Sequence, residues 1–181
     1  MNRQLFYILF SLGFALSAVS CTIAQSEEKI YWEKDLKFDW DLFKEKKNSY
    51  SYFKALTFSG IMYEVEVVNE LVDIKVSSYF IYGKSWVMKG YKKPYLLEHE
   101  KMHFHIAELY KRKLEAICKK YRVDHRTFVN RGFDKALQRD FDRIFNEMEA
   151  YQNKYDKETE HGTKRKTQLE WEAKLKEELG I

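Results

Sequence analysis

The residues that could do chemistry begin with the run His99-Glu100-Lys101-Met102-His103. On a helix, residues four positions apart differ by about 40° in azimuth and about 6 Å in rise, so both imidazoles project from one face. Two such imidazoles suit Zn²⁺, which binds histidine nitrogen at about 2.0–2.1 Å and can keep a position for water. The spacing therefore predicts a zinc site with His99 and His103 as ligands. Glu100 lies about 100° around the helix, beside the ion, and is the predicted catalytic base.

This arrangement predicts hydrolytic chemistry. A zinc ion lowers the pKa of its bound water from about 15.7 toward about 7, which makes hydroxide available at neutral pH. Glu100 would take a proton from that water and later deliver it to a leaving amine. Without a metal, the same run would be a solvated helix that carries two surface histidines.

A third zinc ligand has to come from another part of the chain. His161 is the first candidate, because it ends the second long helix beside Gly162, where the chain can reverse toward the first helix. Glu149, Asp156 and Glu160 are the alternatives. Glu108 is set aside because it lies about 140° around the first helix from His103. His105 faces away from the ion, and His125 lies between helices, so these two are set aside as well.

Alternating residues before this region indicate a β-hairpin. Apolar and charged side chains alternate over residues 63–67 and again over 72–76, which is typical of strands with one buried face. Asn69-Glu70 between the two runs suits a tight connection. The preceding segment carries Trp32 and Trp40, and we interpret it as a short strand or loop with packing aromatic residues.

From Pro94 onward the pattern is helical. Proline is tolerated in the first turn, and the pattern continues to about Tyr121. A second amphipathic run covers residues 133–155 and ends near Gly162, a predicted C-terminal cap. A capping box at 167–170 predicts a short last helix. Strands followed by helices predict an α+β fold: a small antiparallel sheet, two long helices and a short C-terminal helix, with the helices on one face of the sheet.

The first 24 residues have the pattern of a secretory signal peptide, in which Arg3 precedes an apolar run. This run is shorter than the about 20 residues that a membrane span needs. Cleavage after Ala24 would leave residues 25–181 as a single domain. Cleavage before Cys21, in a segment that resembles a lipobox, would leave a lipid anchor instead. Both alternatives predict an exported protein that is periplasmic, extracellular or lipid-anchored, with membrane contact only through a lipid on Cys21.

Composition bounds the remaining function classes. The 181 residues are 45% hydrophobic and 33% charged, which fits one globular domain and argues against disorder. A net charge of +4 is too small to indicate a nucleic-acid partner. Once Cys21 is lipidated or removed, Cys118 is the remaining cysteine, and its place in a helical pattern predicts a buried structural thiol.

The run 96–110, followed by Arg112-Lys113-Leu114, resembles a bacterial family of secreted zinc-dependent proteases whose members are mostly uncharacterised. Residues 36–43, 85–87 and 155–171 agree with further segments of that family. His105 departs from it, since an Asp is common there. The resemblance implies a zincin-like arrangement, metallopeptidase activity and zinc as the cofactor, and it favours His161 as the third ligand.

These observations predict an exported zinc metallopeptidase that acts on a peptide or protein substrate. A strand edge near the site could bind an extended peptide, and Tyr155 is either a second donor to the oxyanion or, more simply, a core residue. Two alternatives are open: a non-catalytic metal-binding envelope protein, and a zinc hydrolase of a non-peptide amide bond. A fourth protein ligand would indicate a structural site, and an open position would indicate catalysis.

Overall fold

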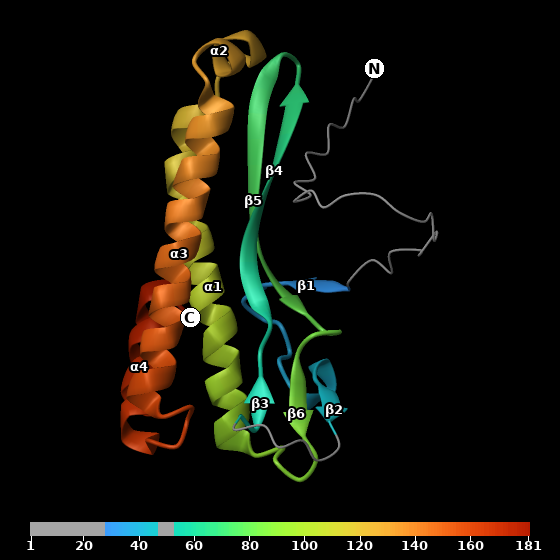
Figure 1. The fold of residues 1–181 in the computed structure, drawn as a ribbon, viewed down its shortest axis with the longest axis vertical. Coiled ribbons are helices and arrows are strands. Elements are labelled where there is room, and N and C mark those ends of the chain that lie inside the picture. The colour runs from blue at the N-terminus through green and yellow to red at the C-terminus, as the bar shows by residue number, and fades with distance from the viewer. Residues whose placement is uncertain (1–27, 47–52) are drawn as a thin grey trace, which may run out of the picture.

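A long β-hairpin and three helices run side by side along the molecule (Figure 1). The computed structural model describes residues 28–46 and 53–181, so the predicted signal peptide with Cys21 lies outside the described residues. The strands are β1 (Lys29–Tyr31), β2 (Lys44–Lys46), β3 (Ala55–Leu56), β4 (Ser59–Val68), β5 (Leu71–Ile81) and β6 (Trp86–Met88). The helices are α1 (Pro94–Cys118), α2 (His125–Asn130), α3 (Phe133–Thr159) and α4 (Arg165–Leu179), with short 3-10 helices at Trp40–Leu42 and Lys119–Tyr121.

The hairpin of β4 and β5 is confirmed with the predicted turn. The strands pair antiparallel from Ser59 opposite Phe80 to Val68 opposite Leu71. Asn69 and Glu70 connect them with φ angles of 50° and 66°. Two consecutive left-handed residues match the twist of a tight hairpin, although neither of them is glycine.

Within residues 28–46 and 53–181, the six strands form two small sheets rather than one. The first has the order β1-β5-β4 and is antiparallel throughout. The second has the order β2-β6-β3, in which β2 pairs parallel with β6 and β3 pairs antiparallel. The short strands of the second sheet carry no long alternation, which is why the sequence pattern did not separate them from loops.

Helix α1 lies at the centre of the molecule, between the strands and the other two long helices (Figure 1). Met102, Ile106 and Leu114 are completely buried, and apolar residues occur on several faces of the helix. Residues 104–110 are all buried, polar ones included, as expected for a helix that is covered on several faces. The predicted α+β fold is confirmed, and α1 is placed so that it can present residues to both layers.

Helix α4 begins earlier than predicted. It starts at Arg165, and the residue before it, Lys164, makes no side-chain capping bond. The predicted capping box at 167–170 is therefore wrong. The backbone N–H of Gln168 donates to the Lys164 carbonyl at 3.0 Å, so the first turn is already complete where the box was expected to begin.

Two further findings concern the described helices. Cys118 is buried and unpaired, and its burial raises the pKa of the thiol to about 11, as a structural thiol requires. No helix within residues 28–46 and 53–181 combines the length and the apolar character that crossing a membrane demands.

Candidate metal centre

Helix α1 supplies two imidazoles that converge. His99 and His103 are one turn apart, and their Nε2 atoms lie 3.3 Å from each other. The side chain of His99 is 2% exposed and that of His103 is 12% exposed. The predicted common face of the two histidines is therefore confirmed, and it points into the structure rather than into solvent.

Helix α3 completes the group with Asp156. Its Oδ1 lies 3.0 Å from His99 Nε2 and 3.1 Å from His103 Nε2. Ligand atoms of these three residues all lie within 4.8 Å of one another, and we call the three the candidate metal centre. Four ligands at about 2.0–2.1 Å in a tetrahedron stand about 3.3–3.4 Å apart, so the observed triangle is close to the size that zinc requires. The residues present therefore fit a metal ion.

His161 lies beside this group, at the end of α3. Its Nδ1 is 3.4 Å from Asp156 Oδ1, and its ring centroid is 4.9 Å from that of Phe53. Glu160, His161 and Gly162 have φ angles of 47°, 52° and 83°, so three consecutive left-handed residues turn the chain here. The predicted chain reversal brings His161 to Asp156. Its role as a ligand stays a prediction.

Gly162 has a specific reason to lack a side chain. A Cβ at this position would lie 3.0 Å from His99 Cγ and 3.0 Å from Gln168 Oε1, closer than nearly all such contacts. The turn after α3 therefore packs its backbone directly on the His99 ring. The other two alternatives for the third ligand lie elsewhere: Glu160 pairs with Lys164 at 3.0 Å, and Glu149 is exposed.

Two further residues on α3 contact the imidazoles of His99 and His103. The ring of Tyr155 stacks on His99 with centroids 4.7 Å apart, and its hydroxyl donates to the His99 carbonyl at 3.4 Å. Tyr155 is completely buried, which confirms the core interpretation over the oxyanion donor. Gln152 contacts His103 through both ends of its amide. Gln152 was not among the predicted site residues, although its position one turn before Asp156 places both on one face of α3.

The charges of the group are strongly coupled. Burial lowers the pKa of His99 to about 4, so that this ring is neutral. Burial also disfavours a charged His103, but its hydrogen bond to Asp156 and the charges of Asp156 and Glu100 outweigh burial and raise its pKa to about 9. Burial opposes ionisation of Asp156, yet hydrogen bonds from both histidines hold its pKa well below the usual range. Without a metal, a proton on His103 thus balances Asp156.

Glu100 is 4% exposed and lies next to the group on α1. Burial raises the pKa of its carboxyl to about 7, against the charge of His103 and hydrogen bonds from Thr57 that favour ionisation. The Thr57 hydroxyl also donates to the Glu100 carbonyl at 3.1 Å, which ties this turn of α1 to the connection between β3 and β4. A carboxyl that titrates near neutrality can both accept and return a proton.

A family model matches residues 90–162 of this chain. Its description is "Bacterial protein of unknown function (DUF922)". The matched region runs from the residues before α1 to Gly162, so it contains every residue of the candidate metal centre together with Glu100 and His161. No curated protein and no solved structure matches the chain.

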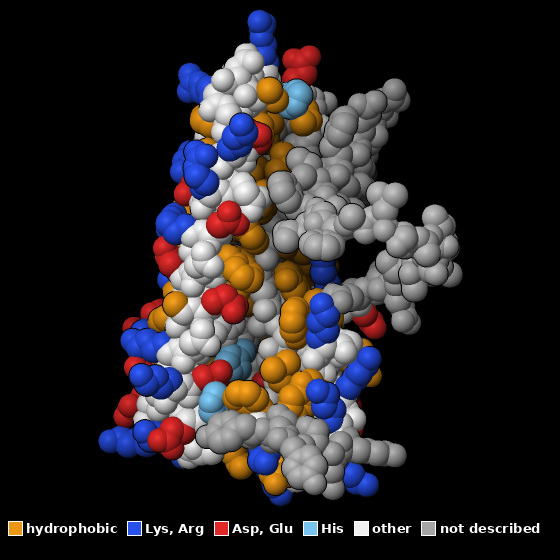
Figure 2. Space-filling view, in the orientation of Figure 1, with side chains coloured by type: hydrophobic (Ala, Val, Ile, Leu, Met, Phe, Trp, Pro, Cys, Tyr) orange, Lys and Arg blue, Asp and Glu red, His pale blue; other side chains and the backbone are white. Residues whose placement is uncertain are grey.

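Within the matched region, the site opens to the surface on one side. Exposure rises from His99 through His103 and Asp156 to His161, whose side chain is 37% exposed. Figure 2 shows histidine and acidic side chains together in the lower part of this face, next to hydrophobic side chains. A ligand could therefore reach the group from the side of Asp156 and His161, whereas Glu100 is buried.

The two residues of α1 that were set aside as ligands face elsewhere. His105 accepts a hydrogen bond at Nδ1 from Trp32 Nε1 at 3.0 Å. Glu108 accepts from the Ser78 hydroxyl at 2.7 Å and from Arg112 Nε at 2.9 Å. Both are buried, and both bond to side chains outside the candidate metal centre, as the helical geometry predicted.

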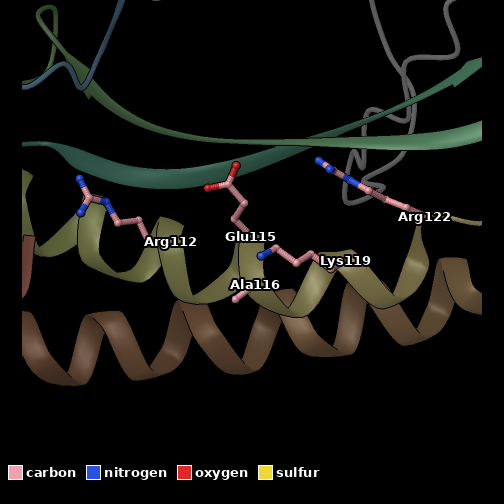
Figure 3. Close-up of a pocket in the computed structure, with 5 residues that line it drawn as sticks. All are labelled: Arg112, Glu115, Ala116, Lys119 and Arg122. Atoms are coloured by element: carbon pink, nitrogen blue, oxygen red, sulfur yellow. The ribbon is translucent and has the colours of Figure 1, made fainter.

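A surface pocket of about 290 Å³ lies at the later part of α1 and the residues after it, where the side chains of Arg112, Glu115 and Arg122 point toward the strands (Figure 3). It is lined by Arg112, Glu115, Ala116, Lys119 and Arg122. Arg112 pairs with Glu108 at 2.9 Å, and Arg122 pairs with Asp73 at 3.4 Å. Both arginines are therefore already engaged in ion pairs, and the pocket is separate from the candidate metal centre.

Proposed function

We propose that the chain is an exported zinc-dependent metallopeptidase. The observation that carries the proposal is the convergence of His99 Nε2, His103 Nε2 and Asp156 Oδ1 beside the buried carboxyl of Glu100. Three protein ligands of this type are the usual set of a catalytic zinc site, which keeps another position for water or substrate. The match to the family model adds no activity, since its description names none.

The residues divide into holding and proton-transfer roles. His99, His103 and Asp156 would hold the ion, and His161 would support Asp156 or serve as a further ligand. A bound zinc ion supplies a Lewis acid that polarises a carbonyl and makes a water more acidic. Glu100 would take the proton from the water that adds to the carbonyl carbon, and would deliver it to the nitrogen as the C–N bond breaks. The pKa of about 7 suits both transfers.

The start of β4 is the place where an extended substrate would bind. Within the described residues β4 pairs only with β5, so its other edge is free to accept a peptide strand. Ser59, its first residue, donates through its hydroxyl to the His103 carbonyl at 3.4 Å. A peptide along this edge would thus lie close to the residues that we propose as catalytic.

Export is part of the proposal and rests on the pattern of residues 1–24. A basic residue, an apolar run and small residues before Cys21 and Ala24 are typical of a secretory signal. The protein would then act in the periplasm, outside the cell, or on the envelope surface if Cys21 carries a lipid.

The decisive experiment compares the purified exported protein with its Glu100→Gln variant. Both are loaded with zinc, assayed for metal content and incubated with an unbiased peptide library whose products are read by mass spectrometry. Because a general base contributes about 100- to 10,000-fold, we expect Glu100→Gln to lose cleavage by that factor while it retains the metal. Glu98→Gln, one residue before His99 and partly exposed, is the matched control and should cleave normally.

The outcomes separate the alternatives. Undiminished cleavage by Glu100→Gln would remove its role as the base. Zinc binding by the wild type without cleavage of any peptide would leave a metal-binding protein or a hydrolase of another amide bond. Absence of zinc binding by the wild type would overturn the proposal as a whole.

A further inference from the structure

Gln152 on α3 contacts Nδ1 of His103 on α1, the ring nitrogen that does not face His99 and Asp156. Its Nε2 donates to the His103 carbonyl at 3.1 Å, and its Oε1 faces His103 Nδ1 within hydrogen-bond distance. Gln152 lies one turn before Asp156, so the same face of α3 presents both residues to His103.

The two contacts define the proton positions of His103. A backbone carbonyl only accepts hydrogen bonds, so the NH₂ group of Gln152 must point at the His103 carbonyl. The amide oxygen is then the atom that faces Nδ1, and since this oxygen only accepts, Nδ1 must carry a proton. In the neutral ring the lone pair is left on Nε2, the atom that lies 3.3 Å from His99 Nε2 and 3.1 Å from Asp156 Oδ1.

His99 has no comparable support. Its Nδ1 is buried and lacks a hydrogen-bond partner among the described residues. Its ring is held by stacking on Tyr155 and by the close approach of Gly162. Both Nε2 atoms face Asp156, but at Nδ1 only the His103 ring makes a directional hydrogen bond, whereas the His99 ring is held there by packing alone.

We propose that Gln152 is the positioning residue that selects Nε2 of His103 for metal binding, an inference that rests on the proposed zinc site. Hydrogen bonds from a metal-ligating histidine to an acceptor fix its tautomer and ring orientation, and loss of such an acceptor typically costs about 10- to 100-fold in metal affinity. His103 is the more exposed of the two histidines, so it has more freedom to rotate once the acceptor is gone.

The experiment measures zinc affinity by competition with a chromophoric chelator for the full exported protein. Gln152→Leu removes the acceptor and should weaken zinc binding about 10- to 100-fold. Gln152→Glu keeps an acceptor toward Nδ1 but cannot donate to the carbonyl, and it should bind zinc within about threefold of the wild type or more tightly. Gln138→Leu is the matched control, because Gln138 also lies on α3 and accepts from Tyr63 at 2.7 Å, far from the metal centre.

A second readout reports the tautomer directly. In the zinc-loaded wild type, ¹⁵N NMR of the histidine rings should show a protonated Nδ1 and a metal-bound Nε2 on His103. Equal zinc affinity of Gln152→Leu and wild type, equal losses in Gln152→Leu and Gln152→Glu, or ligation through Nδ1 would each overturn the positioning role while the zinc site stands. Failure of the wild type to bind zinc would overturn both proposals.

Discussion

Two sides of α1 bury the same residue types but surround them with different partners. Toward the strands, Glu108 meets donors only, the Ser78 hydroxyl and the Arg112 guanidinium. Toward α3, one oxygen of Asp156 lies within 3.4 Å of nitrogen atoms from His99, His103 and His161. The first arrangement is a set of complementary pairs, whereas the second gathers several groups that compete for one position.

The difference shows what distinguishes a site from a buried polar residue. Burial of histidine and glutamate is common to both sides of the helix. In the described structure, lone pairs of histidine nitrogen and carboxylate oxygen converge on one point only toward α3. A cation or a shared proton at that point removes the repulsion between them. The side toward α3 could therefore hold a metal ion, whereas the side toward the strands makes structural bonds.

The largest expected effect separates the two histidine positions. His103→Ala removes a proposed ligand and should weaken zinc binding by more than about 100-fold, a greater loss than that of a supporting residue. His105→Ala, two residues away and bonded to Trp32, should leave zinc affinity unchanged although it loses stability. Equilibrium competition with a chelator measures both, and comparable losses in the two variants would abolish the distinction between the two sides.

The next largest effect is expected in the pH dependence of zinc affinity. Because the pKa of His103 is raised to about 9, this ring carries a proton at pH 7 that zinc must displace. Zinc affinity should rise about tenfold per pH unit from pH 6 to 8 and level off above about 9. Calorimetry in buffers of different ionisation enthalpy should find about one proton released at pH 7, and no release would contradict the charged His103–Asp156 pair.

The raised pKa of His103 also makes the stability of the metal-free protein depend on pH. A pKa that is raised on folding stabilises the folded state fully below the unfolded value of about 6.5, and this contribution is lost as the pH rises through about 9. Urea unfolding of the metal-free protein should therefore show a lower midpoint at pH 9.5 than at pH 6, a difference that His103→Ala should reduce.

The smallest effect belongs to the structural side. Glu108→Ala leaves the buried Ser78 hydroxyl without its partner and should lower the free energy of unfolding by about 1–3 kcal/mol. Glu115→Ala, which removes an ion pair with Lys111 from a side chain that is 43% exposed, should cost less than about 1 kcal/mol. Chemical denaturation provides both values. Zinc affinity should stay at the wild-type value in each variant, and a loss in Glu108→Ala would connect the two sides.

Local patterns predicted much of this architecture. The alternation around Asn69-Glu70 indicated the hairpin, and Pro94 marked the first residue of α1, because both signals act between residues close in the chain. The second sheet was missed, since its strands have two or three residues each and obtain their order from partners distant in sequence.

The residues of the candidate site likewise include some that the sequence predicted and one that it did not. Four-residue spacing sufficed to place His99 and His103 on one face, and to exclude Glu108 from it. Gln152 was not found, because a glutamine on an amphipathic helix carries no signal until its partner across the helix pair is known.

The sequence by itself determined that two imidazoles and a neighbouring carboxyl share one helix, since the 3.6-residue period of α1 dictates their directions. Only the tertiary structure decided that Asp156, among the four candidates for the third ligand, lies within 3.1 Å of both histidines. That choice depends on how α3 packs against α1 and on the left-handed turn that ends at Gly162. No local rule relates residues that are 57 positions apart in the chain, as His99 and Asp156 are.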